Sequence, residues 1–338
     1  MNTNVTPETI RNGAVENRWL IVLVIALTIF PFIAPLFIGT FYTVLMIEAM
    51  IFAIFALGYD ILMGHTGMVS LGHAAYFGLG VYGGALTLIH LSQGLIPLLV
   101  VAILLSAIFA LIVGYFSLRS TGVYFALITF AFAQILYEVV IRSSGFLGGN
   151  NGLTVSTPEL FAAVEISQFT IYYIVLPTMV ALYLGSRRLI NSPLGLIFQA
   201  IGENEQRAAF IGYDVNRYKH ISFIISGMIS GLAGGLFVAT EGFASPDHLF
   251  WLLSGEIIIM TILGGVGTLY GPMVGAGIFI YLETYLNSTF DAWQIILGLI
   301  FVTVVLLFPQ GLAGLLQGPG GPDSLSLQQL RDRLPRRG

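Results

Sequence analysis

Long apolar segments dominate the chain, and short polar or glycine-containing stretches separate them. A helix needs roughly 20 apolar residues to cross a hydrocarbon core about 30 Å thick, so runs of this kind predict membrane spans. The clear runs are Trp19 to Ile38, Phe41 to Leu62, Ile96 to Ser117, Val123 to Ile141, Phe169 to Gly185, Ile221 to Thr240 and Ala292 to Phe308. Less clear runs, short or broken by glycine, are Val69 to His90, Leu252 to Leu263 and Pro272 to Leu286. The pattern predicts an all-α polytopic integral membrane protein with about ten transmembrane helices, some of them short or discontinuous.

The basic residues predict the orientation of these spans, because Lys and Arg gather in short cytoplasmic loops. Ten spans place both termini in the cytoplasm and put 12 of the 13 Lys and Arg residues on that side, with Arg142 outside. Eight spans, the alternative if the short segments are fewer, would keep the same orientation. We therefore expect a cytoplasmic N-terminal segment at 1–18, a transmembrane domain at 19–310 with a cytoplasmic loop at 186–220, and a cytoplasmic tail at 311–338.

Composition agrees with a membrane protein and excludes several functional classes. The chain is 57% hydrophobic and only 9% charged, whereas about a quarter of residues are charged in soluble domains. Its net charge of -4 is too small and too dilute for a nucleic-acid binder. There is no cysteine, no HExxH or GxSxG motif, and no glycine-rich phosphate loop before the single lysine, Lys219. We expect no cofactor or metal on this chain and no enzymatic activity of its own.

The cytoplasmic loop has the signals of two short helices. Ser192 is placed to cap a helix that has Pro193 at its first position, and Gly202 to end it. Asn204 is placed to cap a second helix, Glu205 to Ile211, which Gly212 would close in a left-handed conformation. A helix this short must pack on something to be stable. The pattern leaves open a partner's groove or a connector resting on the membrane interface.

Glycine is enriched: the chain has 40 glycines in 338 residues, about 12%, whereas proteins average near 7%. Some glycines repeat at four-residue spacing, which gives a helix face that another backbone can approach closely: Gly227, Gly231 and Gly235, and then Gly267, Gly271 and Gly275. Others interrupt apolar segments, in GHTGMVSLGHAAYFGLGVYGG from Gly64 and in LGGVGTLYGPMVGAG from Leu263. Paired interruptions in the two halves of a transporter indicate discontinuous helices and a solute path, although tight turns at the membrane edge would look the same.

Carboxylates occur at membrane depth, where facing lipid would be costly. Glu48 and Glu256 are candidate proton or cation sites. Asp60 and Glu138 lie near predicted span ends, where a hydrated carboxylate is the commoner situation. Ser70, His73 and Tyr76 follow the first glycine break and would line a path or form internal hydrogen bonds.

These motifs, in their order, resemble the permease subunit of branched-chain amino acid ABC importers, the LivM type. The resemblance covers Ala53 to Leu316 and rests on LGYDILMGHTGMVSLGHAAYFGLGVYGG, RSTGVYFALITFAFAQI, GGNNGLT, SPLGLIFQAIGENEQRAAFIGYDVNRYK and ILGGVGTLYGPMVGA. Asp60 is a departure, since we expect a neutral amide there. The cytoplasmic loop keeps only the Ala-Ala and Gly of the wider importer pattern.

The resemblance implies a transport subunit of the bacterial inner membrane. Its expected partners are a second, LivH-type permease chain, two cytoplasmic ATPase subunits that bind ATP and Mg, a periplasmic substrate-binding protein, and membrane lipid. Coupling to the ATPases is expected at Glu203, Asn204, Glu205, Arg207, Ala208 and Gly212. The substrate path is expected at Gly67, Ser70, His73, Tyr76, Thr129, Gly264 and Gly265.

The residues by themselves also allow a gradient-driven amino-acid carrier with Glu48 or Glu256 as its coupling site. Such a carrier would need no ATPase, and an uncoupler would stop its uptake while ATP remained. A passive channel, the third alternative, would show no accumulation against a gradient. The capped cytoplasmic loop favours the ATPase-driven scheme, because neither a carrier nor a channel has need of a docking helix there.

Overall fold

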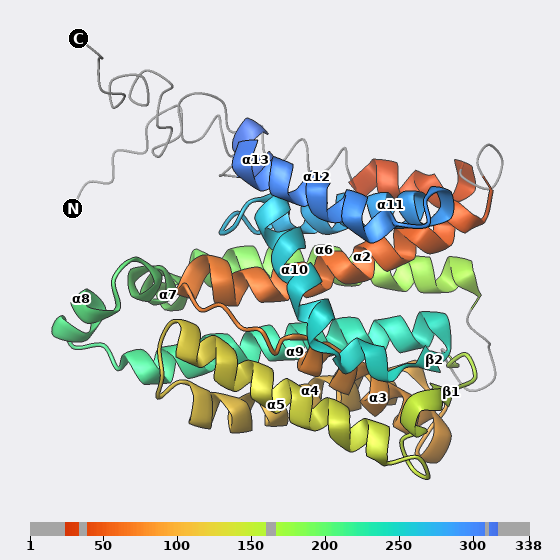
Figure 1. Cartoon of the computed structure of the whole chain (residues 1–338), viewed down its shortest axis with the longest axis horizontal. Helices are drawn as coiled ribbons and strands as arrows, with labels where there is room; N and C mark the ends of the chain where they lie inside the picture. The colour runs from red at the N-terminus through yellow and green to blue at the C-terminus, as the bar shows by residue number, and fades with distance from the viewer. Residues whose placement is uncertain (1–23, 34–38, 160–166, 308–310, 317–338) are drawn as a thin grey trace.

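A computed structural model describes residues 24–33, 39–159, 167–307 and 311–316 of the chain. The described residues form an elongated bundle of helices that lie mostly along the long axis of the molecule (Figure 1). The predicted N-terminal segment 1–18 lies outside the described residues, and so does the predicted tail 311–338 except for residues 311–316. The all-α architecture expected from the apolar pattern is confirmed.

The helices begin with an unlabelled segment, Val24–Ile33, and continue with α2 (Phe41–Asp60), α3 (Ala74–His90), α4 (Leu95–Ser117), α5 (Val123–Arg142), α6 (Gln168–Ile190), α7 (Pro193–Glu203), α8 (Glu205–Phe210), α9 (Val215–Glu241), α10 (Trp251–Gly264), α11 (Tyr270–Thr289), α12 (Trp293–Leu307) and α13 (Gly311–Leu316). A π-helical turn, η1 (Ile61–His65), extends α2, and 3-10 turns occur at η2 (Gly149–Asn151) and η3 (Pro246–Leu249). Two short strands, β1 (Leu153–Thr154) and β2 (Phe243–Ala244), pair antiparallel with Leu153 opposite Ala244.

Among the described residues, five helices are long and apolar enough to cross a membrane: α2 with η1, α4, α5, α6 and α9. Each of the ten predicted spans contains helix where it is described. The run from Val69 differs, because its helix α3 begins only at Ala74. The exact number of crossings and the side on which the termini lie stay predictions.

The helices divide into central and peripheral ones. In the most apolar 18-residue stretch of α2–η1, and in that of α9, 67% of the residues are buried, whereas 28% are buried in the corresponding stretches of α4 and α5. The exposed side chains of α4 are apolar, for example Ile96, Leu104 and Ile108. Such a surface suits lipid, whereas α2 and α9 form the interior of the bundle.

Glycines allow the central helices to approach each other closely. Gly227, Gly231 and Gly235 of α9 all face α4, and a Cβ atom on Gly235 would lie 2.8 Å from Cβ of Ala102. Gly80 of α3 meets the backbone of α9 at Gly231. In the second predicted repeat, Gly271 and Gly275 of α11 face α10, but Gly267 precedes the helix and lies in the turn between them. Small residues thus set the spacing of both helix pairs.

Candidate functional site

The predicted loop 186–220 folds as two capped helices at one end of the molecule (Figure 1). Ser192 caps α7, its Oγ accepting from the backbone N–H of Gly195 at 3.4 Å, and Pro193 is the first helical residue. Helix α7 ends at Glu203, one residue after the predicted end at Gly202. Gly202 also lets α7 approach η1: a Cβ atom there would lie 2.8 Å from the carbonyl oxygen of His65.

Helix α8 begins and ends as the sequence predicts, within one residue. Oδ1 of Asn204 accepts from the backbone N–H of Arg207 at 2.9 Å, and Gly212 adopts φ +96° just after the helix. Ala208 is 1% exposed and packs with Ile201 and Val215. The short helix therefore rests on its own chain through one side.

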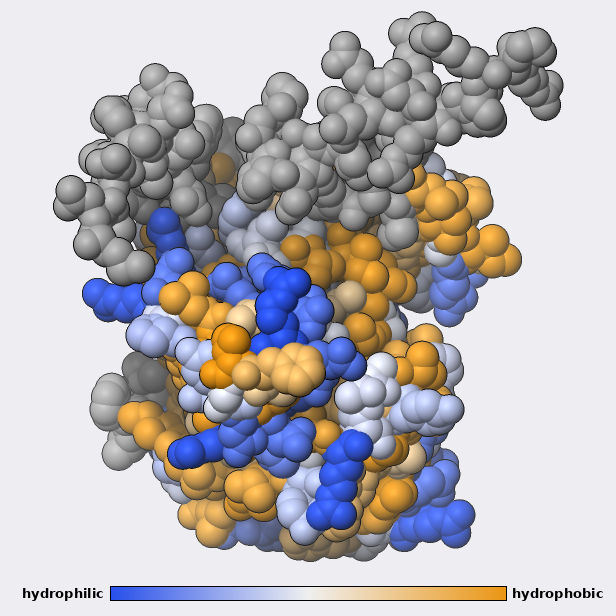
Figure 2. All heavy atoms as spheres, turned by 90° about the vertical axis from the view of Figure 1, so that its left-hand side faces the viewer, coloured by the Kyte–Doolittle hydropathy of each residue, from blue (hydrophilic) through white to orange (hydrophobic). Residues whose placement is uncertain are grey.

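An ion pair fixes α8 to the central helix α9. Nζ of Lys219 lies 2.5 Å from a carboxylate oxygen of Glu205, and the lysine side chain is only 6% exposed. At the C-terminal end of α8, Phe210 is 89% exposed, and the next residue, Ile211, is 67% exposed. Figure 2 shows this end of the molecule, where apolar side chains lie among hydrophilic ones. The α8 tip, defined as Phe210 and Ile211, is thus an apolar surface on an anchored support.

The two predicted glycine breaks meet in the structure. After η1 the chain leaves the helix at Gly67, with φ +69°, and after α10 it turns through Gly265 and Gly267, with φ +119° and +79°. A Cβ atom on Gly64 would lie 2.5 Å from the backbone nitrogen of Gly267. Both helices are therefore interrupted at one place, which we call the glycine junction (Gly64 to Gly67 and Gly264 to Gly267).

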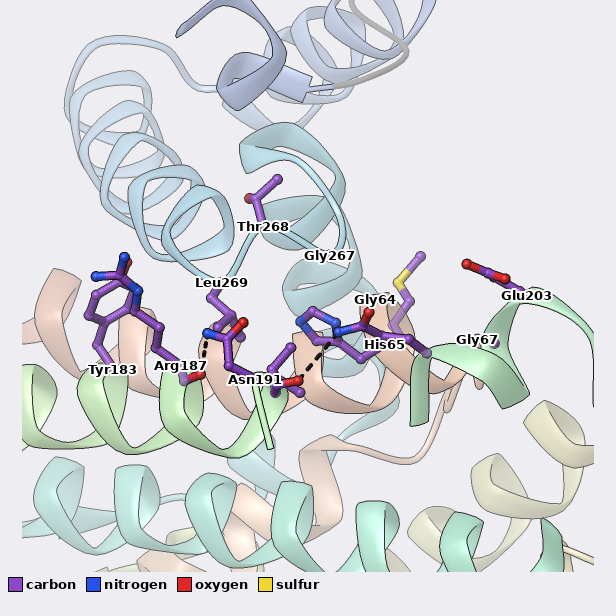
Figure 3. A pocket seen from close by; sticks show the side chains of 14 residues that line it. Gly64, His65, Gly67, Tyr183, Arg187, Asn191, Glu203, Gly267, Thr268 and Leu269 are labelled. Carbon is purple, nitrogen blue, oxygen red and sulfur yellow. Dashed lines mark hydrogen bonds between the residues drawn. The ribbon is translucent and has the colours of Figure 1, made fainter. Parts of the chain in front are cut away.

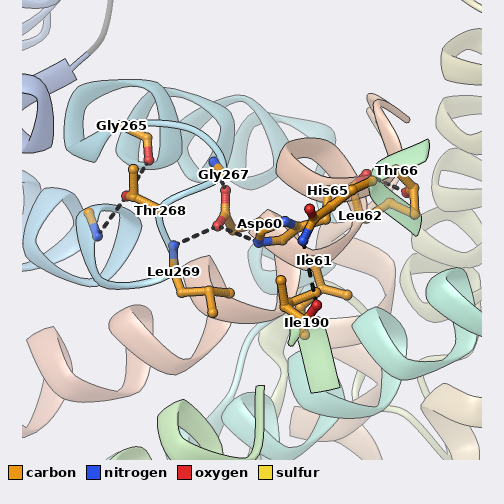
Figure 4. Close-up of polar contacts among 12 residues, drawn as sticks. Asp60, Ile61, Leu62, His65, Thr66, Ile190, Gly265, Gly267, Thr268 and Leu269 are labelled. Atoms are coloured by element: carbon orange, nitrogen blue, oxygen red, sulfur yellow. Dashed lines mark hydrogen bonds and ion pairs between the residues drawn. The ribbon is translucent and has the colours of Figure 1, made fainter. Parts of the chain in front are cut away.

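Asp60 joins the two sides of the glycine junction (Figure 4). Its Oδ1 accepts from the backbone N–H of Gly267 at 2.7 Å, and its Oδ2 from that of Leu269 at 3.0 Å. The residue is 0% exposed, so the expectation of a hydrated carboxylate at a span end is wrong. Thr268 Oγ1 accepts from the backbone N–H of Gly271 within this turn, and Asp60 supplies the acceptors for the N–H groups of Gly267 and Leu269, which would otherwise be buried without partners.

Most of the predicted path residues are enclosed by the protein. Ser70, His73, Tyr76 and Thr129 are at most 1% exposed, and Nε2 of His73 shares a 2.8 Å hydrogen bond with Oγ of Ser226. Gly264 packs against the backbone of Gly271, and Gly265 is buried beside Gly311 of α13. Gly67 alone among the predicted path residues lines one of the two cavities described below. The path role of the others stays a prediction.

A cavity of about 850 Å³, the junction cavity, opens beside the glycine junction (Figure 3). Its walls come from η1, the end of α6, α7 and the turn before α11: Met63, Gly64, His65, Gly67, Tyr183, Arg187, Ile190, Asn191, Gln199, Gly202, Glu203, Gly267, Thr268 and Leu269. Figure 3 shows Arg187 and Glu203 on opposite sides. Glu203, which the sequence grouped with α8, thus borders this cavity.

A second cavity of about 290 Å³, the acidic cavity, lies nearer the other end of α2. It is lined by Glu48, Phe52, Phe237, His248, Glu256, Ile280, Glu283, Thr284 and Asn287. Glu48 and Glu256, which are far apart in sequence, therefore meet at one place. Glu283 was missed, because one carboxylate on a moderately polar helix carries no distinguishing pattern.

The fold and these sites define a multi-pass membrane transport protein with an anchored helix at one end. A family model described as branched-chain amino acid transport system / permease component matches residues 41–307, and the chain belongs to this family. It is a permease subunit of an ABC importer in the bacterial inner membrane, and this assignment replaces the gradient-driven carrier. Its relatives are transport subunits and not enzymes.

Similar proteins include two kinds of permease from one transport system. The high-affinity branched-chain amino acid permease protein LivM of Salmonella typhimurium is 27% identical over 78% of this chain and 68% of its own length. The corresponding LivH protein is 23% identical over 78% of this chain and 91% of its own length. The autoinducer 2 import system permease protein LsrC of Klebsiella pneumoniae is 30% identical over 46% of this chain and 47% of its own length. No solved structure matches the chain.

Proposed function

We propose that this chain forms the pore of an importer for branched-chain amino acids, or for related small amino acids and amides, together with a second, LivH-type permease chain. The similarity to LivM and LivH proteins, which covers 78% of the chain in each case, supports this substrate class. Two cytoplasmic ATPase subunits carry ATP and Mg, and a periplasmic binding protein delivers the solute.

The α8 tip is the observation that carries the coupling proposal. An apolar pair of side chains is exposed on a helix that Lys219 and Ala208 fix to the bundle. A fixed and exposed helix of this kind is suited to a groove on another protein. Movement of an ATPase against α8 would be passed to α9 through the Glu205 and Lys219 ion pair, because that pair joins the two helices directly.

Substitution at the α8 tip tests this coupling. Because Phe210 is 89% exposed, Phe210→Asp should leave the fold and the amount of chain in the membrane unchanged. A charge placed in an apolar groove is costly, so binding-protein-stimulated ATPase activity of the assembled importer should fall at least tenfold. The matched control is Leu91→Asp, an equally drastic change at a residue that is 73% exposed and lies just after α3.

Purification of the tagged chain in mild detergent, with identification of every co-purifying protein, tests the assembly itself. We expect two ATPase subunits and a second permease with the parent chain, and loss of the ATPases with Phe210→Asp. Full stimulation of ATP hydrolysis in the Phe210→Asp importer would contradict docking at α8. A homo-oligomer without ATPase would contradict the whole scheme.

A further inference from the structure

One polar atom on helix α5 lacks a hydrogen bond. Oε1 of Gln134 is buried, and among the described residues no donor lies within hydrogen-bonding reach of it. Gln134 lies near the middle of α5, which is long and apolar enough to cross a membrane. An amide oxygen at this depth is costly unless a donor reaches it, and lipid tails have none. The partner of Gln134 is therefore to be sought outside the described bundle.

Gln134 belongs to a face of the protein where α5 meets α10. Phe130, one turn before it, contacts Trp251 with ring centroids 6.0 Å apart. Tyr137, almost one turn after it, contacts Phe250, just before α10, with ring centroids 5.1 Å apart. Figure 1 shows the two helices on the same side of the bundle. We define the α5–α10 face by Ala131, Gln134, Ile135, Glu138, Trp251 and Gly255.

The α5–α10 face is open and partly polar. The side chain of Ile135 is 59% exposed, that of Trp251 39% and that of Glu138 54%. Gly255 of α10 has free space in front of it, because a Cβ atom there would meet nothing within 4 Å. The amide oxygen of Gln134 can only accept hydrogen bonds. The face therefore fits a neighbour that supplies an N–H or O–H donor and that fills the space at Gly255.

Helix α4 provides the comparison, because its outer surface suits lipid. Its exposed side chains, such as Leu104 at 54% and Ile108 at 56%, carry neither a charge nor an amide. Its polar residues Ser106 and Ser117 are each 0% exposed. The α5–α10 face differs from this surface, because an amide oxygen without a donor lies in it at membrane depth. Such a face is expected to be covered by protein and not by lipid.

We propose that the second permease chain packs against the α5–α10 face and that one of its side chains donates a hydrogen bond to Oε1 of Gln134. Helices in membranes associate through such bonds and through small residues that allow close approach, here Ala131 and Gly255. The donor complements the acceptor that this chain leaves without a partner. The inference rests on the proposed function for the identity of the partner, a LivH-type permease. The position of the contact follows from this chain alone.

Photo-crosslinking in native membranes tests which face is covered. Ile135 on the α5–α10 face and Ile108 on α4 are each replaced by p-benzoylphenylalanine in the whole importer, and the adducts are identified by mass spectrometry. The two positions are matched, since both are isoleucines within apolar helices and are 59% and 56% exposed. We expect Ile135 to give an adduct with the second permease and Ile108 to give no adduct with protein.

Two glycine variants test the close approach. Gly255→Leu and Gly185→Leu add the same side chain where a Cβ atom meets nothing within 4 Å, so neither should disturb the fold of this chain. Gly255→Leu should reduce the amount of second permease that co-purifies in mild detergent by about tenfold, because it overpacks the contact. Gly185→Leu, on α6, should leave that amount unchanged. Gln134→Leu removes one interhelical hydrogen bond and should weaken the association by roughly threefold to tenfold.

A second permease that co-purifies but forms its adduct with Ile108, or with neither position, would overturn the assignment of the face. Unchanged co-purification with Gly255→Leu would overturn it as well. Failure of the proposed function would be visible before any substitution is made, because no second permease would co-purify with the parent chain. An adduct between two copies of this chain at Ile135 would overturn the choice of partner.

Discussion

Two carboxylates near the ends of their helices have opposite surroundings. Glu138 is 54% exposed and pairs with Arg142 one turn later on α5. Asp60 is fully buried and accepts hydrogen bonds from two backbone N–H groups on the far side of the glycine junction. The first resembles a surface ion pair, which contributes little to stability, whereas the second satisfies groups that have no water to bond.

Asp60→Leu should therefore destabilise the protein. It leaves the N–H groups of Gly267 and Leu269 without acceptors, each at a cost of about 1–3 kcal/mol, partly offset because a charge is no longer buried. We expect a net loss of about 2 kcal/mol in the free energy of unfolding, measured as a lower thermal midpoint in detergent. Glu138→Leu is the control and should change stability by less than about 0.5 kcal/mol. Equal midpoints for the two variants would show that Asp60 is not a structural link.

At the scale of elements, close packing of α9 depends on which glycines meet another backbone. A Cβ atom on Gly231 would collide with Ser106 and lie 2.8 Å from the carbonyl oxygen of Ala102 on α4. Gly277 of α11 meets nothing within 4 Å. Both are glycines within apolar helices, and only their neighbours distinguish them.

Gly231→Val should separate α4 from α9 and lower stability by about 1–3 kcal/mol, the usual cost of overpacking. Gly277→Val, the same change in open space, should have little effect. The comparison is made by the fraction of each variant that remains monodisperse after heating in detergent. The packing account fails if the two variants retain the same fraction at every temperature.

At the scale of the whole molecule, the two ends of the bundle differ in charge and in structure. The described basic residues Arg187, Arg188, Arg207, Arg217 and Lys219 surround α7 and α8. The β1–β2 pair and the glycine-rich turn at η2 lie at the opposite end of the bundle (Figure 1). The positive-inside rule then predicts that α8 lies in the cytoplasm.

Single cysteines test this orientation. Asn150→Cys in η2 should react with a membrane-impermeant maleimide in cells whose outer membrane is permeable. Gln206→Cys in α8 should react only after the inner membrane is disrupted. Both positions are exposed, so access of the reagent is limited by the membrane and not by the fold. The reverse pattern would invert the topology and remove the basis for an ATPase at α8.

The sequence by itself determined the features that depend on neighbours along the chain. Spans follow from apolar length, and the caps Ser192, Asn204 and Gly212 follow from local hydrogen bonding and backbone freedom, which is why α7 and α8 lie where they were predicted. The close approach of Gly202 to His65 could not be predicted in this way, because the two residues are far apart in sequence.

Only the tertiary structure decided which distant residues meet. Asp60 and Gly267, Glu205 and Lys219, and the three glutamates of the acidic cavity come together through packing of separate helices. No period or local propensity records such pairs, because one helix face is compatible with many partners. Burial makes these contacts specific, because a polar group without a partner is costly in the low-dielectric interior. A buried polar group therefore needs one particular partner, whereas an apolar side chain can pack against many.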